Sequence, residues 1–141
     1  MYTDKLTRLA DFIDNYVANR ENWEDYFNLE SFADGGWKDK ECGTTACAVG
    51  WGTIEFKNEG LHLFEDGLQG EEYQIGYDMS TKFGLVYRRV TGWNAVNIFF
   101  DLNHDEAEYL FASWKYAEQP TSPKTVVNRI REFVKTGEMA P

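Results

Sequence analysis

Hydrophobic residues recur every three or four positions over residues 3–20, in the segment TDKLTRLADFIDNYVANR. This spacing is typical of one face of an amphipathic α-helix. Charged residues such as Arg8 and Asp11 fall largely on the other side. We therefore predict a first helix whose core-facing stripe consists of Leu6, Leu9, Ile13, Tyr16 and Val17.

The same period returns near the C-terminus, over residues 122–137. Ser122 is a favourable N-cap, Pro123 suits the first helical position, and Gly137 is predicted to end the helix. The predicted apolar stripe consists of Val126, Val127, Ile130, Phe133 and Val134.

A further helix is predicted to follow Asn103. Asn103 and Glu106 have the spacing of a capping box, in which each side chain accepts a hydrogen bond from the other residue's backbone N–H. Leu102 is placed to pack against Ala107 as a hydrophobic staple. The residues predicted to face the core are Ala107, Leu110, Phe111 and Trp114.

Small residues dominate the segment ACAVGWG. With Thr44 as N-cap, residues 45–57 are predicted to form a helix that is apolar on nearly all sides, apart from a narrow edge at Glu55. Each Gly costs a helix about 1 kcal/mol relative to Ala, a loss that close packing against neighbours explains. This helix is therefore predicted to be buried and central, and to end at Gly60. Its large contacts are expected from Trp51, Ile54 and Phe56.

Residues 61–77 predict two short strands joined by a Gly-rich acidic turn, with Leu61 and Leu63 facing Tyr73, Ile75 and Tyr77. Residues 83–93 fit a strand or a helix. A chain of 141 residues is the size of one ordinary domain. We predict a single α+β domain over residues 1–141, mainly helical, with a buried Ala/Gly-rich helix and a small antiparallel β element.

The formal net charge is −10, and residues 55–78 carry seven acids against one base, Lys57. Such a surface repels phosphate, so direct nucleic-acid binding is not expected, except through a basic strip such as Arg88 and Arg89. The acids either keep the protein soluble or attract a basic protein surface. The candidate binding residues are those of the predicted turn, namely Glu65, Asp66, Glu71 and Glu72.

No segment approaches the ~20 apolar residues that span a bilayer, and the first residues carry charges where a signal peptide is apolar. The protein is therefore expected in the cytoplasm, without a membrane partner. In that compartment Cys42 and Cys47 are expected to be reduced, with a bridge across their short loop as the alternative.

The two cysteines are the candidate catalytic residues if the protein is an enzyme. The start of a helix can lower the pKa of a thiol such as Cys47, and His62 or His104 would supply the base. A zinc site would need all four residues of the set Cys42, Cys47, His62 and His104, but their gaps of 4, 14 and 41 residues do not match usual zinc spacing. We favour a structural role, with Cys47 packed as a small hydrophobe. No metal or cofactor is expected.

Two further groups have a structural interpretation beside a functional one. Aromatic residues alternate with acids over residues 21–37, and we expect Trp23, Tyr26, Phe27 and Trp37 to cover the core rather than to form a contact surface. His104 and Glu108 lie one helical turn apart and are expected to face solvent.

The segments CGTTACAVGW, NIFFDLNHDEAEYLF and SPKTVVNRIREF together resemble a group of small, mostly uncharacterised proteins of bacteriophages and bacteria. That group combines a Cys-Gly-Thr-x-x-Cys-x-x-Gly-Trp block with a Phe-Phe-Gly-Leu stretch, an acidic helix and a closing helix carrying Val-x-x-Arg-Ile. Asp101 replaces the Gly of the second motif. The matching residues are Cys42, Gly43, Thr44, Cys47, Gly50, Trp51, Phe99, Phe100, Leu102, Leu110, Phe111, Pro123, Val126, Arg129 and Ile130. The resemblance covers roughly residues 27–134 and implies a phage or bacterial cytoplasmic protein, without a reaction.

The sequence therefore predicts a non-enzymatic, phage-type accessory protein that binds a host or phage protein with a basic surface. Its acidity favours an inhibitor of a host nucleic-acid-binding or defence protein. One alternative is a cysteine-dependent hydrolase, and another is a small-ligand binding protein with a pocket beside the central helix.

Overall fold

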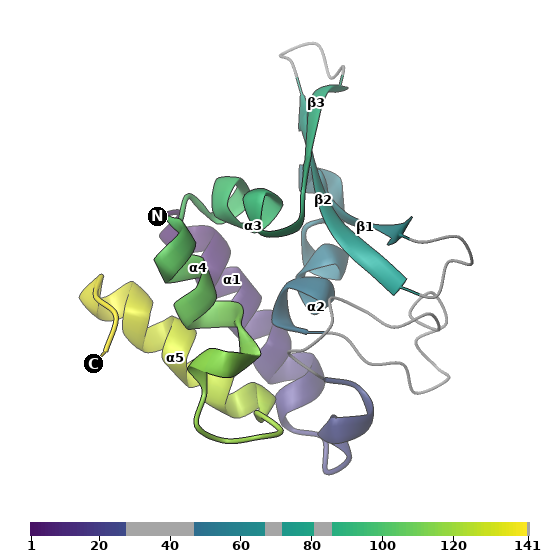
Figure 1. Ribbon diagram of the computed structural model, residues 1–141. Coiled ribbons are helices and arrows are strands. Elements are labelled where there is room, and N and C mark those ends of the chain that lie inside the picture. Colours follow the sequence, from purple (N-terminus) through teal and green to yellow (C-terminus); the bar gives the residue numbers. More distant parts are fainter. Residues whose placement is uncertain (28–46, 67–71, 81–85, 141) are drawn as a thin grey trace.

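The computed structural model describes residues 1–27, 47–66, 72–80 and 86–140. Within these ranges the chain forms five α-helices and one three-stranded antiparallel sheet with the order β1-β2-β3 (Figure 1). The elements are α1 (Thr3–Ile13), α2 (Ala48–Glu55), β1 (Leu61–Asp66), β2 (Glu72–Ser80), β3 (Val86–Thr91), α3 (Gly92–Phe100), α4 (His104–Phe111) and α5 (Pro123–Thr136). The predicted fold class, mainly helical α+β with a small antiparallel β element, is confirmed.

Helix α2 lies between α1 and the sheet. It packs against α1 on one side and against β1 on the other, while α1 also packs against α5 (Figure 1). Its buried residues are Ala48, Val49, Gly50, Trp51, Gly52 and Thr53. The predicted buried helix rich in Ala and Gly is therefore present.

The start of α2 differs from the prediction. The helix begins at Ala48, and its N-cap is Cys47, whose extended backbone has φ −76° and ψ 177°. The Cys47 Sγ accepts a hydrogen bond from the Gly50 N–H at 3.4 Å. A cap residue stands directly before the first helical turn. The prediction of Thr44 as N-cap was therefore wrong, and Thr44 itself lies outside the described residues.

The end of α2 is close to the predicted position. A 3₁₀ turn over Lys57–Glu59 follows the helix, and Gly60 ends it in the left-handed conformation with φ 93°. A Cβ at Gly60 would lie 2.7 Å from the backbone oxygen of Asp78. Both the φ angle and the close backbone therefore require glycine here.

Helix α1 continues as a π-helical turn over Asp14–Ala18. Val17 is buried like the rest of the predicted stripe, but Tyr16 is 55% exposed. The hydrogen bonds of a π-helix run to the fifth residue, which widens the turn. Val17, four residues after Ile13, therefore stays on the stripe, whereas Tyr16, three residues after Ile13, leaves it. The prediction that Tyr16 faces the core was wrong for this reason.

The predicted capping signals of the last two helices are confirmed. Asn103 Oδ1 accepts a hydrogen bond from the Glu106 N–H at 2.8 Å, and Glu106 Oε1 accepts one from the Asn103 N–H at 3.0 Å. Ser122 Oγ accepts a hydrogen bond from the Thr125 N–H at 3.2 Å. Gly137 ends α5 with φ 71°.

The prediction that Trp114 faces inward was wrong. Helix α4 ends at Phe111, and Ala112 is extended with φ −84° and ψ 134°. The helical period therefore stops before it reaches Trp114, which lies in a 3₁₀ turn over Ser113–Lys115 and is 63% exposed.

The hairpin prediction is confirmed in its register. Leu61 pairs with Tyr77 and Leu63 with Ile75, so the expected residues lie opposite each other on β1 and β2. The undecided segment 83–93 contributes β3, which pairs with β2 through Tyr77 and Val90. Helix α3, which follows β3, was not predicted, because its nine residues are largely β-branched or aromatic and therefore have a low helix propensity.

Asp101 separates α3 from α4. It has φ 54° and ψ 56°, a left-handed conformation that glycine adopts most readily. The Leu102 N–H donates to the Asn97 carbonyl at 2.9 Å and so closes the end of α3. The turn therefore has a glycine-like backbone although the residue is aspartate.

Phenylalanine rings connect α2, α3 and α4 within the core. The Phe56 ring centre lies 5.0 Å from that of Phe99 and 5.9 Å from that of Phe100, in edge-on arrangements. Phe100 also lies 5.6 Å from Phe111, and Phe99 lies 5.2 Å from Tyr77 of β2. The Phe100–Phe111 pair is tilted by 39°, whereas the other three pairs are edge-to-face, an arrangement that stabilises by about 0.5–1.5 kcal/mol beyond the buried area.

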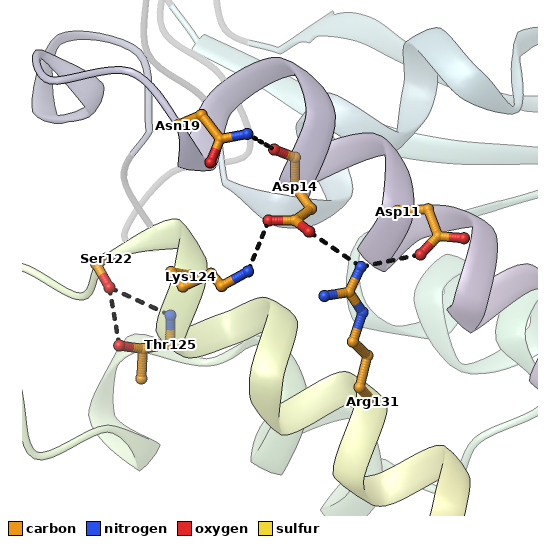
Figure 2. Close-up of polar contacts among 7 residues, drawn as sticks. All are labelled: Asp11, Asp14, Asn19, Ser122, Lys124, Thr125 and Arg131. Atoms are coloured by element: carbon orange, nitrogen blue, oxygen red, sulfur yellow. Dashed lines mark hydrogen bonds and ion pairs between the residues drawn. The ribbon is translucent and has the colours of Figure 1, made fainter.

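An ionic cluster joins the first helical segment to α5 (Figure 2). Asp14 accepts a hydrogen bond from Lys124 Nζ at 2.9 Å and from Arg131 Nη2 at 3.1 Å. Arg131 also donates to Asp11 Oδ1 at 3.0 Å. These hydrogen bonds, that from Lys124 above all, lower the pKa of Asp14 below its ordinary value.

Gly52→Leu is expected to lower the free energy of unfolding by about 1–3 kcal/mol, because the added side chain overpacks the contact between α1 and α2. A Cβ at Gly52 already meets Leu9 Cδ1 at 3.0 Å. Gly52→Ala is the matched control, and it should cost much less because Ala regains about 1 kcal/mol of helix propensity. Urea denaturation of the three proteins measures both differences. A Gly52→Leu variant as stable as wild type would contradict the close contact.

Asp14→Asn is expected to lower the free energy of unfolding at pH 7 by about 1 kcal/mol, the usual size for partly exposed ion pairs. A carboxyl whose pKa is lowered by folding stabilises the folded state above its unfolded pKa, and this contribution is lost as the pH falls. The difference between variant and wild type should therefore shrink below the ordinary pKa of 3.8. Asp11→Asn, which removes one contact to Arg131, should cost less. Denaturation curves across acidic pH test the pattern, and a pH-independent difference would contradict it.

Candidate interaction surface

Cys47 does not have the environment of a nucleophile. Cys47 is only 3% exposed. Burial raises the pKa of its thiol to about 11, although the backbone hydrogen bonds at the helix start act to lower it. At neutral pH about one molecule in ten thousand would carry the thiolate, which is the reactive form. The pKa shift therefore runs opposite to the lowering that a cysteine hydrolase requires. Cys42 lies outside the described residues.

The two histidines lie on different elements with partners of their own. His62 on β1 has its Nδ1 3.1 Å from the Gly60 carbonyl and 3.6 Å from Asp78 Oδ2. His104 in the first turn of α4 has its Nε2 3.5 Å from Glu108 Oε1. Among the residues the structure describes, no three His, Cys, Asp or Glu side chains are placed to hold a metal ion.

Three acids of the segment 55–78 whose side chains the structure describes are paired within the chain. Arg8 Nη2 lies 3.2 Å from Glu55 Oε1 and 2.8 Å from Glu59 Oε2. Arg89 Nε donates to Asp78 Oδ1 at 2.6 Å, and this hydrogen bond lowers the pKa of Asp78. This pair also neutralises Arg89, one of the two residues of the basic strip Arg88 and Arg89.

Three of the four candidate binding acids belong to the far end of the hairpin. The backbones of Glu65, Asp66 and Glu72 form the last paired positions of β1 and β2, with Asp66 opposite Glu72. The prediction that these three residues belong to the turn was wrong, because the strands extend further than predicted. Glu71 and residues 67–70 lie outside the described residues. The hairpin thus brings three of the four candidate residues to one end of the sheet.

The arginines of the described residues mostly contact groups of the same chain. Arg129 Nη1 donates to the carbonyls of Tyr109 and Lys115 at 2.9 and 2.8 Å. Arg20 Nε donates to the Tyr16 carbonyl at 2.9 Å. Arg8, Arg89 and Arg131 are paired with carboxylates as described above. Five arginine side chains therefore contact carboxylates or carbonyls of their own chain. Among the described residues, exposed acids outside these pairs include Asp4, Glu21, Glu24, Asp25, Asp105, Glu132 and Glu138.

An aromatic cluster lies at the starts of α3 and α4 and in the turn after α4. The Trp93 ring centre is 6.3 Å from that of Trp114, with 64° between the planes, and 6.4 Å from that of His104. Trp93 is partly buried, whereas Trp114 and His104 are exposed. We call Trp93, Trp114 and His104 the tryptophan cluster. Sequence reasoning missed it because Trp114 was assigned to the core.

The aromatic residues near the N-terminus cover the core, as predicted for those that the structure describes. Phe27 is buried, and Trp23 and Tyr26 are partly buried against the core. The Tyr26 carbonyl accepts a hydrogen bond from Trp51 Nε1 at 2.9 Å. Trp37 lies outside the described residues.

A groove beside the central helix is too small for a typical ligand. It has a volume of about 210 Å³ and includes Arg8, Tyr16 and Glu55 among its lining residues. Ligand pockets usually measure about 300–1,000 Å³. This groove therefore gives little support to the small-ligand interpretation. A larger groove of about 530 Å³ lies by Asp105, Tyr109 and Arg129, away from α2.

Comparison with known proteins identifies no relative. No protein-family model, curated protein or solved structure matches the chain. The resemblance carried by the Cys-Gly-Thr block therefore stays a prediction. Among the described residues, no helix has both the length and the apolar character needed to cross a membrane.

Cys47 is expected to react slowly with iodoacetamide in the folded protein. In a Cys42→Ser background, labelling at pH 8 should be about 100-fold or more slower than in urea, because both burial and the raised pKa suppress the thiolate. Mass spectrometry of timed samples gives the two rates. Fast native labelling with a midpoint near neutral pH would contradict the structural role and favour the hydrolase.

Proposed function

We propose that this protein acts by binding a partner protein with a basic surface and carries out no reaction of its own. The observation that carries the proposal is the charge distribution. The chain has a net charge of −10, and its arginines largely contact its own carboxylates, carbonyls and rings. The excess of acid therefore faces solvent, where it attracts positive surfaces over about a Debye length.

The partner class follows from the same charge. Proteins that hold nucleic acid present basic clefts, and an acidic protein surface can occupy such a cleft. The motif resemblance favours a phage or bacterial setting in the cytoplasm, with a host nucleic-acid-binding or defence protein as partner. The buried Cys47 thiol argues against the cysteine-dependent hydrolase as an alternative.

The proposal is tested by capture of the partner. The tagged protein is incubated with lysate of a bacterial host, and bound proteins are identified by mass spectrometry at low and high salt. We expect a basic protein that is retained at low salt and released at high salt. Retention of no protein above the level of the tag alone would contradict the proposal.

Neutralising the hairpin acids is expected to slow association with that partner by up to about tenfold at low salt, because surface charges act mainly on the association rate. The variant combines Glu65→Gln, Asp66→Asn, Glu71→Gln and Glu72→Gln. A matched control converts the exposed Glu21, Glu24, Asp25 and Glu132 to amides, which changes the net charge equally. Surface plasmon resonance at two ionic strengths compares the three proteins. Equal rates for both variants would show that total charge, not the hairpin, drives association.

A further inference from the structure

We infer that the groove between α4 and α5 binds a small zwitterionic ligand of the amino-acid class. The carboxylate of this ligand lies at Arg129 and Lys115, and its ammonium group lies toward Asp105. The inference goes beyond the proposed function and does not depend on it, since a free amino acid is not a protein partner. We call this site the Tyr109 groove, and its lining residues are Asp105, Tyr109, Lys115, Arg129, Met139 and Ala140.

The Tyr109 groove has the size of a ligand site. Its volume is about 530 Å³, within the range of about 300–1,000 Å³ that is usual for ligand pockets. Its walls come from α4, the 3₁₀ turn after α4, α5 and the residues after α5, and the two helices lie side by side (Figure 1). The Ala140 N–H donates to the Tyr109 hydroxyl at 3.1 Å. This hydrogen bond holds the residues after α5 against α4, so the groove has a fixed wall on that side.

Arg129 is held in one position by the end of α4 and the turn after it. Its Nη1 donates to the Tyr109 carbonyl at 2.9 Å and to the Lys115 carbonyl at 2.8 Å. Its Cζ lies 3.7 Å from the Tyr116 ring centre and 4.5 Å from that of Tyr109. Carbonyls and rings carry no net charge, and no carboxylate among the described residues pairs with Arg129. A guanidinium that is fixed in place and not neutralised suits a carboxylate, because its N–H groups match the two carboxylate oxygens.

The other polar groups of the groove are also available to a ligand. Lys115 is exposed, and within the described ranges no acid lies at ion-pair distance from its Nζ. Asp105 lines the same groove and is exposed, but it pairs with neither Lys115 nor Arg129. The Tyr109 hydroxyl accepts from Ala140 and donates its own proton to no acceptor in the described part of the chain. The groove therefore presents charges of both signs that do not neutralise each other.

These charges select the ligand. A carboxylate is attracted by the two cations, and an ammonium group is attracted by Asp105. A phosphate would bring additional negative charge beside Asp105, and a simple amine would leave both cations without a partner. Met139 is 44% exposed and offers apolar surface to the side chain of the ligand. An amino acid combines both ionic groups and an apolar part in one small molecule.

Phenylalanine is the first probe, because two matched compounds each lack one of its ionic groups. Phenethylamine lacks the carboxylate, and phenylpropanoate lacks the ammonium group. Two-dimensional NMR follows the backbone N–H signals of the lining residues and the Nε–H signal of Arg129 during titration. The other common amino acids and inorganic phosphate are added separately at about 10 mM, enough to load a weak millimolar site. We expect at least one amino acid to shift these signals and to bind more tightly than its amine and acid analogues.

Lys115→Gln is expected to weaken binding of the amino acid about fivefold or more, because it removes one charged partner of the carboxylate. Asp105→Asn should weaken binding of the amino acid by a similar factor, but not binding of the acid analogue, which has no ammonium group. Lys135→Gln and Glu132→Gln are the matched controls, since they make the same charge changes at exposed positions outside the groove. All four changed side chains are exposed, so the variants are expected to fold, and both controls should bind like wild type.

The outcomes separate this inference from the proposed function. If no amino acid shifts the signals of the groove, or if Lys115→Gln and Lys135→Gln bind equally well, the inference is wrong. Phosphate or either analogue binding as tightly as the amino acid would also overturn it. None of these results affects the capture of a basic protein partner, which is measured separately. Failure to capture a partner would likewise leave the amino-acid titration unchanged.

Discussion

The close contact between α1 and α2 determines where the other elements can lie. A Cβ at Gly52 would stand 3.0 Å from Leu9 Cδ1, so the two helices approach as closely as the missing side chain allows. Helix α2 in turn packs against β1, and its distance from α1 therefore sets the distance of the sheet from the helices. Phe56, directly after α2, packs against Phe99 and Phe100, so the position of α2 also determines that of α3. The small residues of α2 therefore allow the close packing on which the positions of the sheet and α3 depend.

Charge acts on this fold mainly outside the core. The ion pairs of Arg131 and Lys124 with Asp14 join the π-helical turn after α1 to α5 at a partly exposed position, where each pair contributes little to stability. Each ion pair neutralises an acid together with a base, so the net charge of −10 is the same with and without the pairs. The surplus of 24 acidic over 14 basic residues therefore sets the sign of the field around the protein.

Local signals predicted the helix ends well and the irregular turns poorly. The caps at Asn103 and Ser122 depend on neighbours three residues away, so the sequence specifies them directly. The burial of α2 followed from its composition, and the hairpin followed from alternation. The π-helical turn that exposes Tyr16 and the early end of α4 that exposes Trp114 depend on packing across the molecule, which a helical period does not contain. Residue type drew attention to the cysteines and histidines of the candidate site, whereas the tryptophan cluster exists only through the meeting of α3 and α4.

The buried N-cap of α2 also bears on oxidation. Peroxide attacks thiolates, and the first oxidation product of cysteine forms most readily at exposed thiols with a low pKa. Cys47 is buried and its pKa is raised to about 11. A buried thiol with a raised pKa reacts slowly with peroxide. Helix α2 would therefore keep its N-cap and its packing in a cell under oxidative stress.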